Sequence, residues 1–326
     1  MTTFRHIGGI SDPGRKRRRN EDAYVIEPPL FAVADGMGGA QAGEVASRLA
    51  AAALKESGAG RGGVQQLITV IQEANRRVYA RSNADPNASG MGTTITVALV
   101  ENGQVSFGHV GDSRAYLIRD GAMEQLTEDH SLVGELMRSG KLSPEEAETH
   151  PQRSVITRAL GTDPDVDVDT FTIAAQTGDV FLLCSDGLTT MVSNETILDL
   201  VERNRGSMDK ALRALVTAAN KGGGEDNITV VAFEIADEAT VDDTREQALP
   251  ARADPTDEDT LTEADAVPAV DTGVIPAEEI QRELAEKERK ERAARRRHLR
   301  RRIAAWLALL LIVAAIALVL YLRFVR

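Results

Sequence analysis

The sequence predicts an α+β domain whose strands pair in an antiparallel manner. Two pairs of strand-like runs are each joined by a two-residue turn, Asn102-Gly103 in the first and Asp120-Gly121 in the second, and such turns strongly favour a tight β-hairpin. Consecutive hairpins build an antiparallel meander and not a parallel βαβ series. Residues 1–236 are enough for one domain of this kind, since β-rich single domains commonly reach about 200–250 residues.

The other elements follow from the periodicity of apolar residues. Apolar and β-branched runs predict strands, and apolar residues at helical spacing predict helices. We expect strands over residues 3–10, 23–26, 30–34, 93–101, 104–110, 115–118, 123–126, 171–173, 179–184 and 227–235. We expect helices over residues 42–55, 64–82, 195–202 and 208–219. Residues 128–160 are polar, with a helix start at 143–146, and form either a mobile flap near the site or an ordinary pair of surface helices.

Composition restricts the class of protein. The 326 residues carry a net charge of -12, and the single cysteine, Cys184, excludes an internal disulfide and suggests a reducing compartment. The five histidines are scattered without the spacing of a zinc site. Residues 15–19 are five consecutive cations, and such a run is usually a solvated face. Nucleic-acid binding is not indicated, because the domain is acidic overall and no aromatic residues interrupt the run.

The chain changes character after residue 236. Residues 237–277 are acidic and nearly free of aromatic side chains, which predicts a disordered linker. Residues 278–302 have the pattern of a charged juxtamembrane helix that becomes basic towards its end. At the other end of the sequence, the polar N-terminal residues predict no cleavable signal peptide.

Residues 303–322 contain no charged side chain and predict a transmembrane helix. About 20 residues at about 1.5 Å each span roughly 30 Å, the thickness of a bilayer core. Trp306 and Tyr321 lie near the two ends of the segment, as interfacial aromatic residues do. The basic run 295–302 precedes it, which predicts a cytoplasmic domain by the positive-inside rule. Only the short tail 323–326 follows, so we expect a single-pass protein of the cell membrane.

Four carboxylates at the ends of predicted strands predict one assembled site. They are Asp35, Asp112, Asp186 and Asp226. An Asp-Gly pair after a strand is by itself most often a turn, but four such positions in one domain favour a shared role. Oxygen ligands without histidine or cysteine suit Mg²⁺ or Mn²⁺ and not zinc. Two such ions can activate a water molecule against a phosphorus atom, while an arginine from the basic run binds the phosphoryl group.

Other hydrolase chemistries fit the sequence badly. Cys184 has Thr190 at the position where a cysteine phosphatase needs its arginine. Ser185 lacks the Gly-x-Ser-x-Gly elbow of the serine hydrolases. The sequence also contains no Gly-x-x-x-x-Gly-Lys-[Ser/Thr] loop for a nucleotide.

Six short motifs follow one another in order along residues 4–236. They are Arg17-x-x-Asn20-Glu21-Asp22, Asp35-Gly36-Met37-Gly38-Gly39, Gly90-Met91-Gly92-Thr93-Thr94, Gly111-Asp112-Ser113-Arg114, Ser185-Asp186-Gly187 and Glu225-Asp226-Asn227. Together they resemble the metal-dependent protein phosphatases of type 2C, and the methionine of the second motif resembles the bacterial branch. The resemblance implies a central sandwich of two antiparallel β-sheets flanked by helices. It also implies a phosphoserine/phosphothreonine hydrolase that uses Mn²⁺ or Mg²⁺.

The same resemblance implies roles for the metal ligands. Asp35 would bridge two core ions, and the carbonyl of Gly36 would bind one of them. Asp186 and Asp226 would complete the shell of the other ion. Asp112, together with Asp186, matches a third and weaker metal position.

Three further residues and the proton donor follow from the resemblance. Glu21 and Asp22 would act on metal-bound waters, directly or through other ligands. Arg17 matches the phosphate-binding arginine by its spacing to Glu21. Eukaryotic members carry a histidine, a candidate general acid, where Met37 stands here. The leaving-group proton would then come from a metal-bound water or from His130.

The histidines and the cysteine also have a simpler interpretation. The alternative for His130 is an ordinary core or surface histidine. We expect His109 and Cys184 to be packing residues within strands. None of these three residues then takes part in the chemistry.

The predicted anchor suggests which partners the protein meets. Bacterial phosphatases of this type often oppose membrane-anchored Ser/Thr kinases, so the phosphorylated Ser/Thr proteins that serve as substrates would include such kinases. A tether with a long linker raises their effective concentration. One alternative is a catalytically inactive, membrane-tethered phosphoprotein-binding module, against which the complete set of aspartates argues. Another is a signalling scaffold that acts through the acidic linker. Its function would be retained after deletion of residues 1–236.

Overall fold

The computed structural model describes residues 3–38, 42–58, 62–143, 146–147 and 150–236. Within these ranges no helix is both long enough and apolar enough to cross a membrane. The predicted linker, juxtamembrane helix, transmembrane helix and tail all lie outside the described residues, and these predictions stay predictions.

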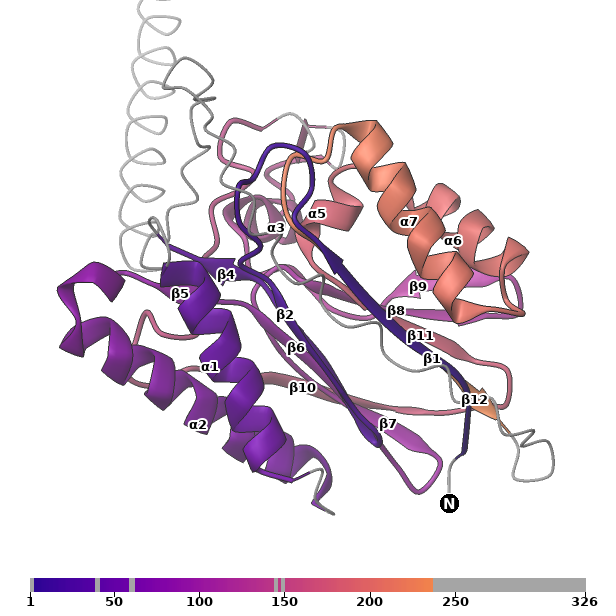
Figure 1. Cartoon of the computed structure of the whole chain (residues 1–326), viewed down its shortest axis with the longest axis horizontal. Coiled ribbons are helices and arrows are strands. Elements are labelled where there is room, and N and C mark those ends of the chain that lie inside the picture. The colour runs from indigo at the N-terminus through magenta and orange to yellow at the C-terminus, as the bar shows by residue number, and fades with distance from the viewer. Residues whose placement is uncertain (1–2, 39–41, 59–61, 144–145, 148–149, 237–326) are drawn as a thin grey trace, which may run out of the picture. The chain divides into compact units, whose positions relative to one another are not determined.

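Two five-stranded antiparallel sheets form the centre of the domain (Figure 1). The first sheet has the order β1 (Thr3–Asp12), β12 (Ile228–Ala236), β11 (Val180–Cys184), β8 (Arg114–Arg119) and β9 (Ala122–Gln125). The second has the order β10 (Asp169–Ala174), β7 (Gln104–Val110), β6 (Ile95–Glu101), β3 (Leu30–Ala34) and β2 (Ala23–Glu27). The first and last long strands, β1 and β12, are neighbours, so the described chain begins and ends within one sheet.

Aromatic side chains from both sheets fill the layer between them. Phe31 of the second sheet stacks on Phe233 of the first with ring centroids 4.1 Å apart, and Phe181 stacks on Phe233 at 5.3 Å. All three are fully buried. Burial of a side chain of this size contributes about 1.5–3 kcal/mol, so this apolar layer holds the two sheets face to face.

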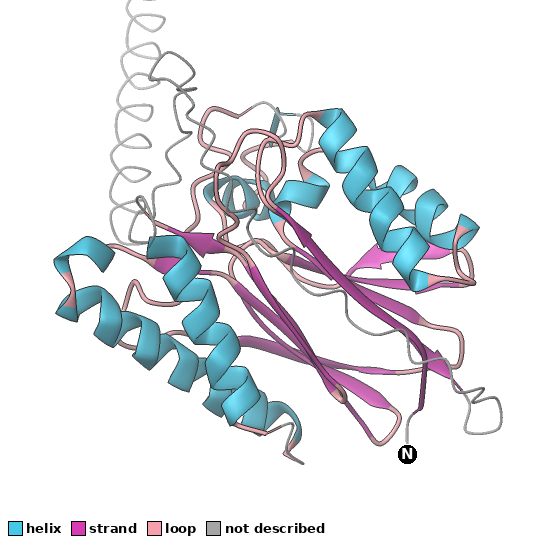
Figure 2. Cartoon of the chain, viewed as in Figure 1, coloured by secondary structure: helices cyan, strands magenta, loops and turns pink. Residues whose placement is uncertain are grey.

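Helices cover the outer face of each sheet (Figure 2). On the second sheet pack α1 (Ala42–Glu56) and α2 (Gly63–Ala84), and on the first pack α6 (Asn194–Arg203) and α7 (Met208–Gly222). Ser193 and Ser207 cap the last two helices by accepting hydrogen bonds from backbone N–H groups of the first turn. The short elements are β4 (Gly36–Met37), η1 (Pro86–Ala88), β5 (Gly92–Thr93), α3 (Leu132–Arg138) and α5 (Asp186–Thr189).

The predicted two-sheet sandwich with flanking helices is confirmed for the described domain. At the first hairpin turn, Asn102 and Gly103 have φ angles of 52° and 76°, the left-handed pair that a tight hairpin requires. The expected strand over residues 93–101 is wrong in one detail, because it breaks at Thr94 into β5 and β6. The break exists because Thr94 N donates to the Asp35 carbonyl and so turns the backbone towards the acidic strand end.

The segment 128–160 contains α3 as its longest described helix. The predicted helix start is confirmed, since Ser143 N donates to Glu146 Oε2 and Glu146 N donates to Ser143 Oγ in a reciprocal cap. Whether this segment moves as a flap stays a prediction.

Candidate active site

The strand ends that carry the acidic residues meet at one end of the sandwich. Asp35 follows β3, Asp186 follows β11, and Asp226 precedes β12. Asp22 and Asp112 complete the group, immediately before β2 and shortly after β7. This is the end where the β1–β2 loop, β4 and α5 gather in Figure 1.

The aspartates lie near enough to one another for their negative charges to interact. Burial raises the pKa of Asp35 well above its ordinary value, and the negative charges of the other four aspartates raise it further. Burial likewise raises the pKa of Asp112 well above its ordinary value, and the negative charge of Asp186 raises it further. The predicted assembly of strand-end carboxylates into one site is therefore what the tertiary structure contains.

Two of the aspartates have less extreme pKa values. Burial raises the pKa of Asp22 to about 7, although hydrogen bonds from the Thr229 and Ser185 hydroxyls favour its charged form. Burial also raises the pKa of Asp186 to about 6, and the charge of Asp226 adds to the shift. So much buried negative charge calls for a compensating cation.

Three observations test whether the residues fit hard metal ions. Asp22 Oδ1 and Asp186 Oδ1 are buried without a hydrogen-bond partner in the described structure. A Cβ placed on Gly43 would lie 2.7 Å from Glu21 Oε2 and 2.8 Å from the Gly36 carbonyl oxygen, so two oxygens share a cradle that only glycine leaves open. Every side-chain donor in the group is an oxygen, which suits Mg²⁺ or Mn²⁺.

The acidic side chains do not form a complete metal cage by themselves. Among the described residues, no three His, Cys, Asp or Glu side chains surround one point closely enough to hold an ion without further ligands. Mg²⁺ usually keeps several water ligands and binds few protein groups directly. The orphaned carboxylate oxygens and the glycine cradle are therefore the observations that favour a metal-binding site here.

Paired threonines fix the position of Asp35. Asp35 N donates to Thr94 Oγ1 at 3.0 Å, and Thr94 N donates to the Asp35 carbonyl at 2.8 Å. Thr93 Oγ1 donates to the same carbonyl at 2.8 Å. The Gly90-Met91-Gly92-Thr93-Thr94 motif is thus a support for Asp35, a role that the sequence analysis did not assign.

Ser185 holds Asp22 in one orientation. Its hydroxyl donates to Asp22 Oδ2 at 2.9 Å and accepts from Thr229 N at 3.0 Å. The sequence analysis considered Ser185 only as a possible nucleophile and missed this function. Its position beside Asp186 in a recognised motif was the available signal.

The basic loop between β1 and β2 reaches the acidic group through Arg17. Arg17 Nη2 lies 2.8 Å from Asp226 Oδ2, and both side chains are about one-third exposed, at 31% and 33%. Burial raises the pKa of Glu21, while the positive charge of Arg17 lowers it. The predicted phosphate-binding arginine therefore lies at the mouth of the site, paired with a predicted metal ligand.

His130 is fully engaged by hydrogen bonds. It is 3% exposed, its Nδ1 accepts from Gly111 N at 3.0 Å, and its Nε2 donates to Asp169 Oδ2 at 3.1 Å. Because neither ring nitrogen is free to face a leaving group, the structure favours the structural interpretation of His130 over that of a proton donor. His109 is buried too, and burial lowers its pKa to about 4.

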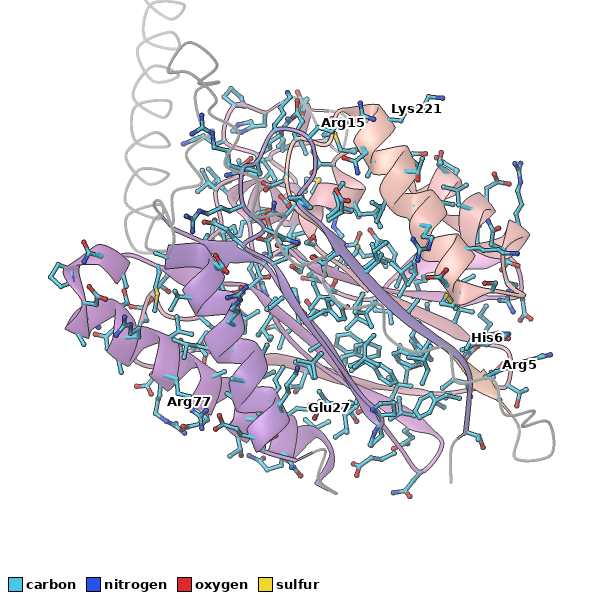
Figure 3. All side chains as sticks on the ribbon, in the orientation of Figure 1. Arg5, His6, Arg15, Glu27, Arg77 and Lys221 are labelled. Atoms are coloured by element: carbon cyan, nitrogen blue, oxygen red, sulfur yellow. The ribbon has the colours of Figure 1, made fainter. Side chains whose placement is uncertain are left out.

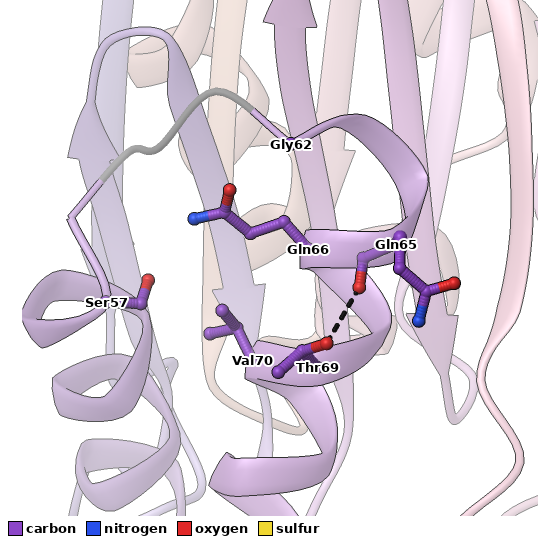
Figure 4. Close-up of a pocket in the computed structure, with 6 residues that line it drawn as sticks. All are labelled: Ser57, Gly62, Gln65, Gln66, Thr69 and Val70. Atoms are coloured by element: carbon purple, nitrogen blue, oxygen red, sulfur yellow. Dashed lines mark hydrogen bonds between the residues drawn. The ribbon is translucent and has the colours of Figure 1, made fainter.

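One hollow lies away from the acidic group, where α1 ends and α2 begins (Figure 4). Its only drawn hydrogen bond runs from Thr69 Oγ1 to the Gln65 carbonyl. The described residues that line it are Ser57, Gly62, Gln65, Gln66, Thr69 and Val70. None of these six carries an ionisable side chain, so the described lining offers no acid–base or metal chemistry.

The two-sheet sandwich, the oxygen-only acidic centre and the arginine at its edge define a metal-dependent phosphoester hydrolase. The protein phosphatase 2C family model matches residues 15–226. The chain belongs to this family and is a protein serine/threonine phosphatase of its bacterial branch.

The similarity to known phosphatases covers about 70% of the chain. The chain is 43% identical over 248 residues to the serine/threonine phosphatase stp of Listeria welshimeri, covering 70% of this chain and 95% of that one. It is 40% identical over 240 residues to PstP of Mycobacterium tuberculosis, covering 73% of this chain and 46% of that one. The crystal structure of the M. tuberculosis phosphatase PstP/Ppp aligns with a TM-score of 0.69 and 39% identity, over 72% of this chain and all of that one. A PstP catalytic domain in complex with two manganese ions aligns with a TM-score of 0.67 and 38% identity, over 73% of this chain and all of that one.

Proposed function

We propose that the protein hydrolyses phosphoserine and phosphothreonine esters of proteins with Mn²⁺ or Mg²⁺, at the cytoplasmic face of the membrane. The observation that carries the hydrolytic part is the convergence of five aspartates beside Arg17, two of which have a buried oxygen without a hydrogen-bond partner. The two manganese ions of the similar PstP structure support the choice of metal.

The proposed metal ligands come from three parts of the site. Asp35, Asp186 and Asp226 would hold metal, with the Gly36 carbonyl at one ion and Asp112 at a third position. Bound Mn²⁺ or Mg²⁺ lowers the pKa of water and offsets charge on the phosphoryl oxygens.

Around these ligands, other groups orient the reactants. Arg17 would bind two phosphoryl oxygens with its planar guanidinium, and it would exchange its bond to Asp226 for the substrate. Asp22 Oδ2 accepts a hydrogen bond from the Ser185 hydroxyl, and Asp22 Oδ1 has no partner. Oδ1 would therefore accept a hydrogen bond from water. Glu21 Oε2, beside Gly43, is placed to do the same.

The hydrolytic part is tested by phosphate release from a phosphothreonine peptide. We expect turnover by the purified full chain with Mn²⁺, none with EDTA, and loss of at least about a hundredfold in Asp186→Asn, in keeping with the removal of a transition-state-stabilising group. Asp199→Asn, a change on α6 at a side chain that is 46% exposed, is the matched control and should retain activity. No metal-dependent turnover in a folded protein would instead favour the inactive phosphoprotein-binding module.

The membrane part of the proposal is supported by the uncharged residues 303–322 and the basic run 295–302 that precedes them. It predicts that the protein sediments with membranes and resists extraction by high salt and alkali. Recovery of the intact chain in the soluble fraction would refute it.

Opposition to membrane Ser/Thr kinases is supported by the same predicted anchor. A tethered phosphatase meets membrane substrates at a raised effective concentration. In cells, a form lacking residues 237–326 should therefore leave membrane phosphoproteins more phosphorylated than the full chain does at equal abundance. Unchanged phosphorylation would contradict the proposal.

A further inference from the structure

The β1–β2 loop carries more positive charge than phosphate binding requires. It contains the five consecutive cations of residues 15–19, of which only Arg17 reaches the acidic centre. Arg15, Lys16, Arg18 and Arg19 are exposed. Arg15 lies at the same end of the molecule as Lys221 of α7 in Figure 3.

The backbone of this loop is held in place and is not a free arm. The Gly224 carbonyl accepts from Arg15 N at 2.8 Å and from Lys16 N at 3.1 Å. The Asn227 side chain donates to the Arg19 carbonyl at 2.8 Å, near the end of the loop, and to the Pro13 carbonyl at 3.0 Å, at its start. Since the loop is already ordered, the cost of fixing its side chains on a ligand is reduced.

Three of the five cations already have carboxylate partners. Arg17 pairs with Asp226. The exposed Lys16 Nζ lies 2.6 Å from Glu225 Oε1, and Arg19 Nη1 lies 3.9 Å from Glu44 Oε2.

The side chains of Arg15 and Arg18 differ from these three. In the described structure neither has a hydrogen-bond or ion-pair partner. Two uncompensated arginines thus stand close in the sequence to Arg17, the arginine that pairs with Asp226.

We propose that Arg15 and Arg18 bind acidic side chains adjacent to the phosphorylated residue, so that the enzyme prefers acidic phosphopeptide segments. The proposal rests on the proposed phosphatase function. Arginine binds carboxylates in a bidentate manner, and an extended peptide advances only about 3.3 Å per residue. A peptide whose phosphate occupies Arg17 therefore brings its neighbouring residues to the same short loop.

An acidic peptide fits this loop better than an anionic membrane surface does. Arg15 and Arg18 belong to the same short loop as Arg17, which pairs with an aspartate of the catalytic centre, and a membrane lying on this loop would cover Arg17. Carboxylates beside the phosphorylated residue are attracted to the two unpaired guanidinium groups, which gives Arg15 and Arg18 a role in substrate binding.

Steady-state kinetics of the full chain with Mn²⁺ tests the proposal. Two phosphothreonine peptides differ only in carrying Glu or Gln at the positions beside the phosphorylated residue. The wild type should favour the Glu peptide by about fivefold in kcat/KM, as expected for two exposed ion pairs. The preference should lie mainly in KM and shrink as salt is raised.

The double variant Arg15→Gln/Arg18→Gln should lose the preference while hydrolysing p-nitrophenyl phosphate at the wild-type rate. Arg203→Gln, an exposed arginine of α6, is the control and should keep the preference. Equal kcat/KM for the two peptides in the wild type, or a preference that survives in the double variant, would overturn the proposal.

A vesicle-binding assay distinguishes the proposed peptide binding from binding of the loop to an anionic membrane. If the double variant loses binding to phosphatidylserine vesicles and keeps its peptide preference, the loop is a membrane contact and the proposal is wrong. Failure of the phosphatase function itself would look different, because p-nitrophenyl phosphate would then not be hydrolysed at all.

Discussion

Glu21 and Asn227, 206 residues apart in the sequence, are joined by a hydrogen bond of 2.7 Å from Glu21 N to Asn227 Oδ1. The same carboxamide donates from Nδ2 to the carbonyls of Pro13 and Arg19, at 3.0 and 2.8 Å. One side chain, next in the sequence to the predicted metal ligand Asp226, thus holds both ends of the basic loop and the backbone of Glu21.

Replacing this carboxamide should therefore damage both the fold and the site. Asn227→Ala removes three hydrogen bonds, each worth about 1 kcal/mol, so we expect the free energy of unfolding to fall by about 2–3 kcal/mol in urea titrations. Because Arg17 is carried by the released loop, kcat/KM for a phosphothreonine peptide should fall at least about tenfold.

Asn204→Ala provides the comparison for this prediction. Asn204 Nδ2 makes one side-chain hydrogen bond, to the Leu200 carbonyl on α6, and its loss should cost about 1 kcal/mol without affecting kcat/KM. Equal kinetics in Asn227→Ala and the wild type would show that the loop keeps its position without the carboxamide.

The second prediction concerns the backbone at Gly36. A Cβ at this position would lie 2.1 Å from the Gly43 carbonyl oxygen and 2.5 Å from that of Glu21. Both obstacles are backbone atoms and cannot rotate away, so Gly36→Ala should destabilise the domain by about 3 kcal/mol, the upper end of the usual cost of overpacking. Thermal unfolding is the measurement, and Gly206→Ala, with nothing within 4 Å of the added Cβ, should unfold near the wild-type temperature. Similar melting temperatures for the two variants would contradict the close approach.

The third prediction separates the structural and the proton-donating interpretations of His130. His130→Leu leaves Gly111 N without its buried acceptor, which should cost about 1–3 kcal/mol. His130→Asn places an oxygen near the same N–H and should recover part of that stability. In the asparagine variant, kcat for a phosphothreonine peptide should remain within a few-fold of the wild type.

A general acid would behave differently. Its removal costs about 10²–10⁴-fold, and the loss would be larger for the phosphothreonine peptide than for p-nitrophenyl phosphate, whose leaving group needs no proton. That pattern in His130→Asn would restore His130 as the proton donor.

The fourth prediction is a pH dependence of the metal-free protein. Burial raises the pKa of Asp22 to about 7 and that of Asp186 to about 6, from an ordinary value of 3.8. The folded state therefore binds more protons than the unfolded chain between about pH 4 and pH 7. Asp22 and Asp186 therefore make the metal-free protein less stable as pH rises from about 4 to about 7.

Metal should reverse that trend, because cation and protons compete for the same carboxylates. The increase in melting temperature caused by Mn²⁺, measured against EDTA, should be small at pH 5 and grow towards pH 8. Asp186→Asn should show a weaker rise. A Mn²⁺ effect that is constant from pH 5 to pH 8 would show that these carboxylates are not the binding groups.

Much of this domain could be predicted from the sequence because its signals are local. Asn102-Gly103 specifies a left-handed turn through its own backbone preferences, and β3 is a run of five buried apolar residues. Asp35 could be recognised because it stands where such a strand ends. The order of short motifs then sufficed to place the chain among the type 2C phosphatases.

The tertiary structure alone decided how those residues work together. Neither the hydrogen bonds of Asn227 across 206 residues of sequence nor the break of a strand at Thr94 leaves a pattern in the neighbouring residues. His130 looked free to act as an acid until the fold placed Gly111 N and Asp169 against its two nitrogens. Backbone preferences act over a few residues, whereas hydrogen-bond partners and burial depend on segments that meet only when the two sheets pack.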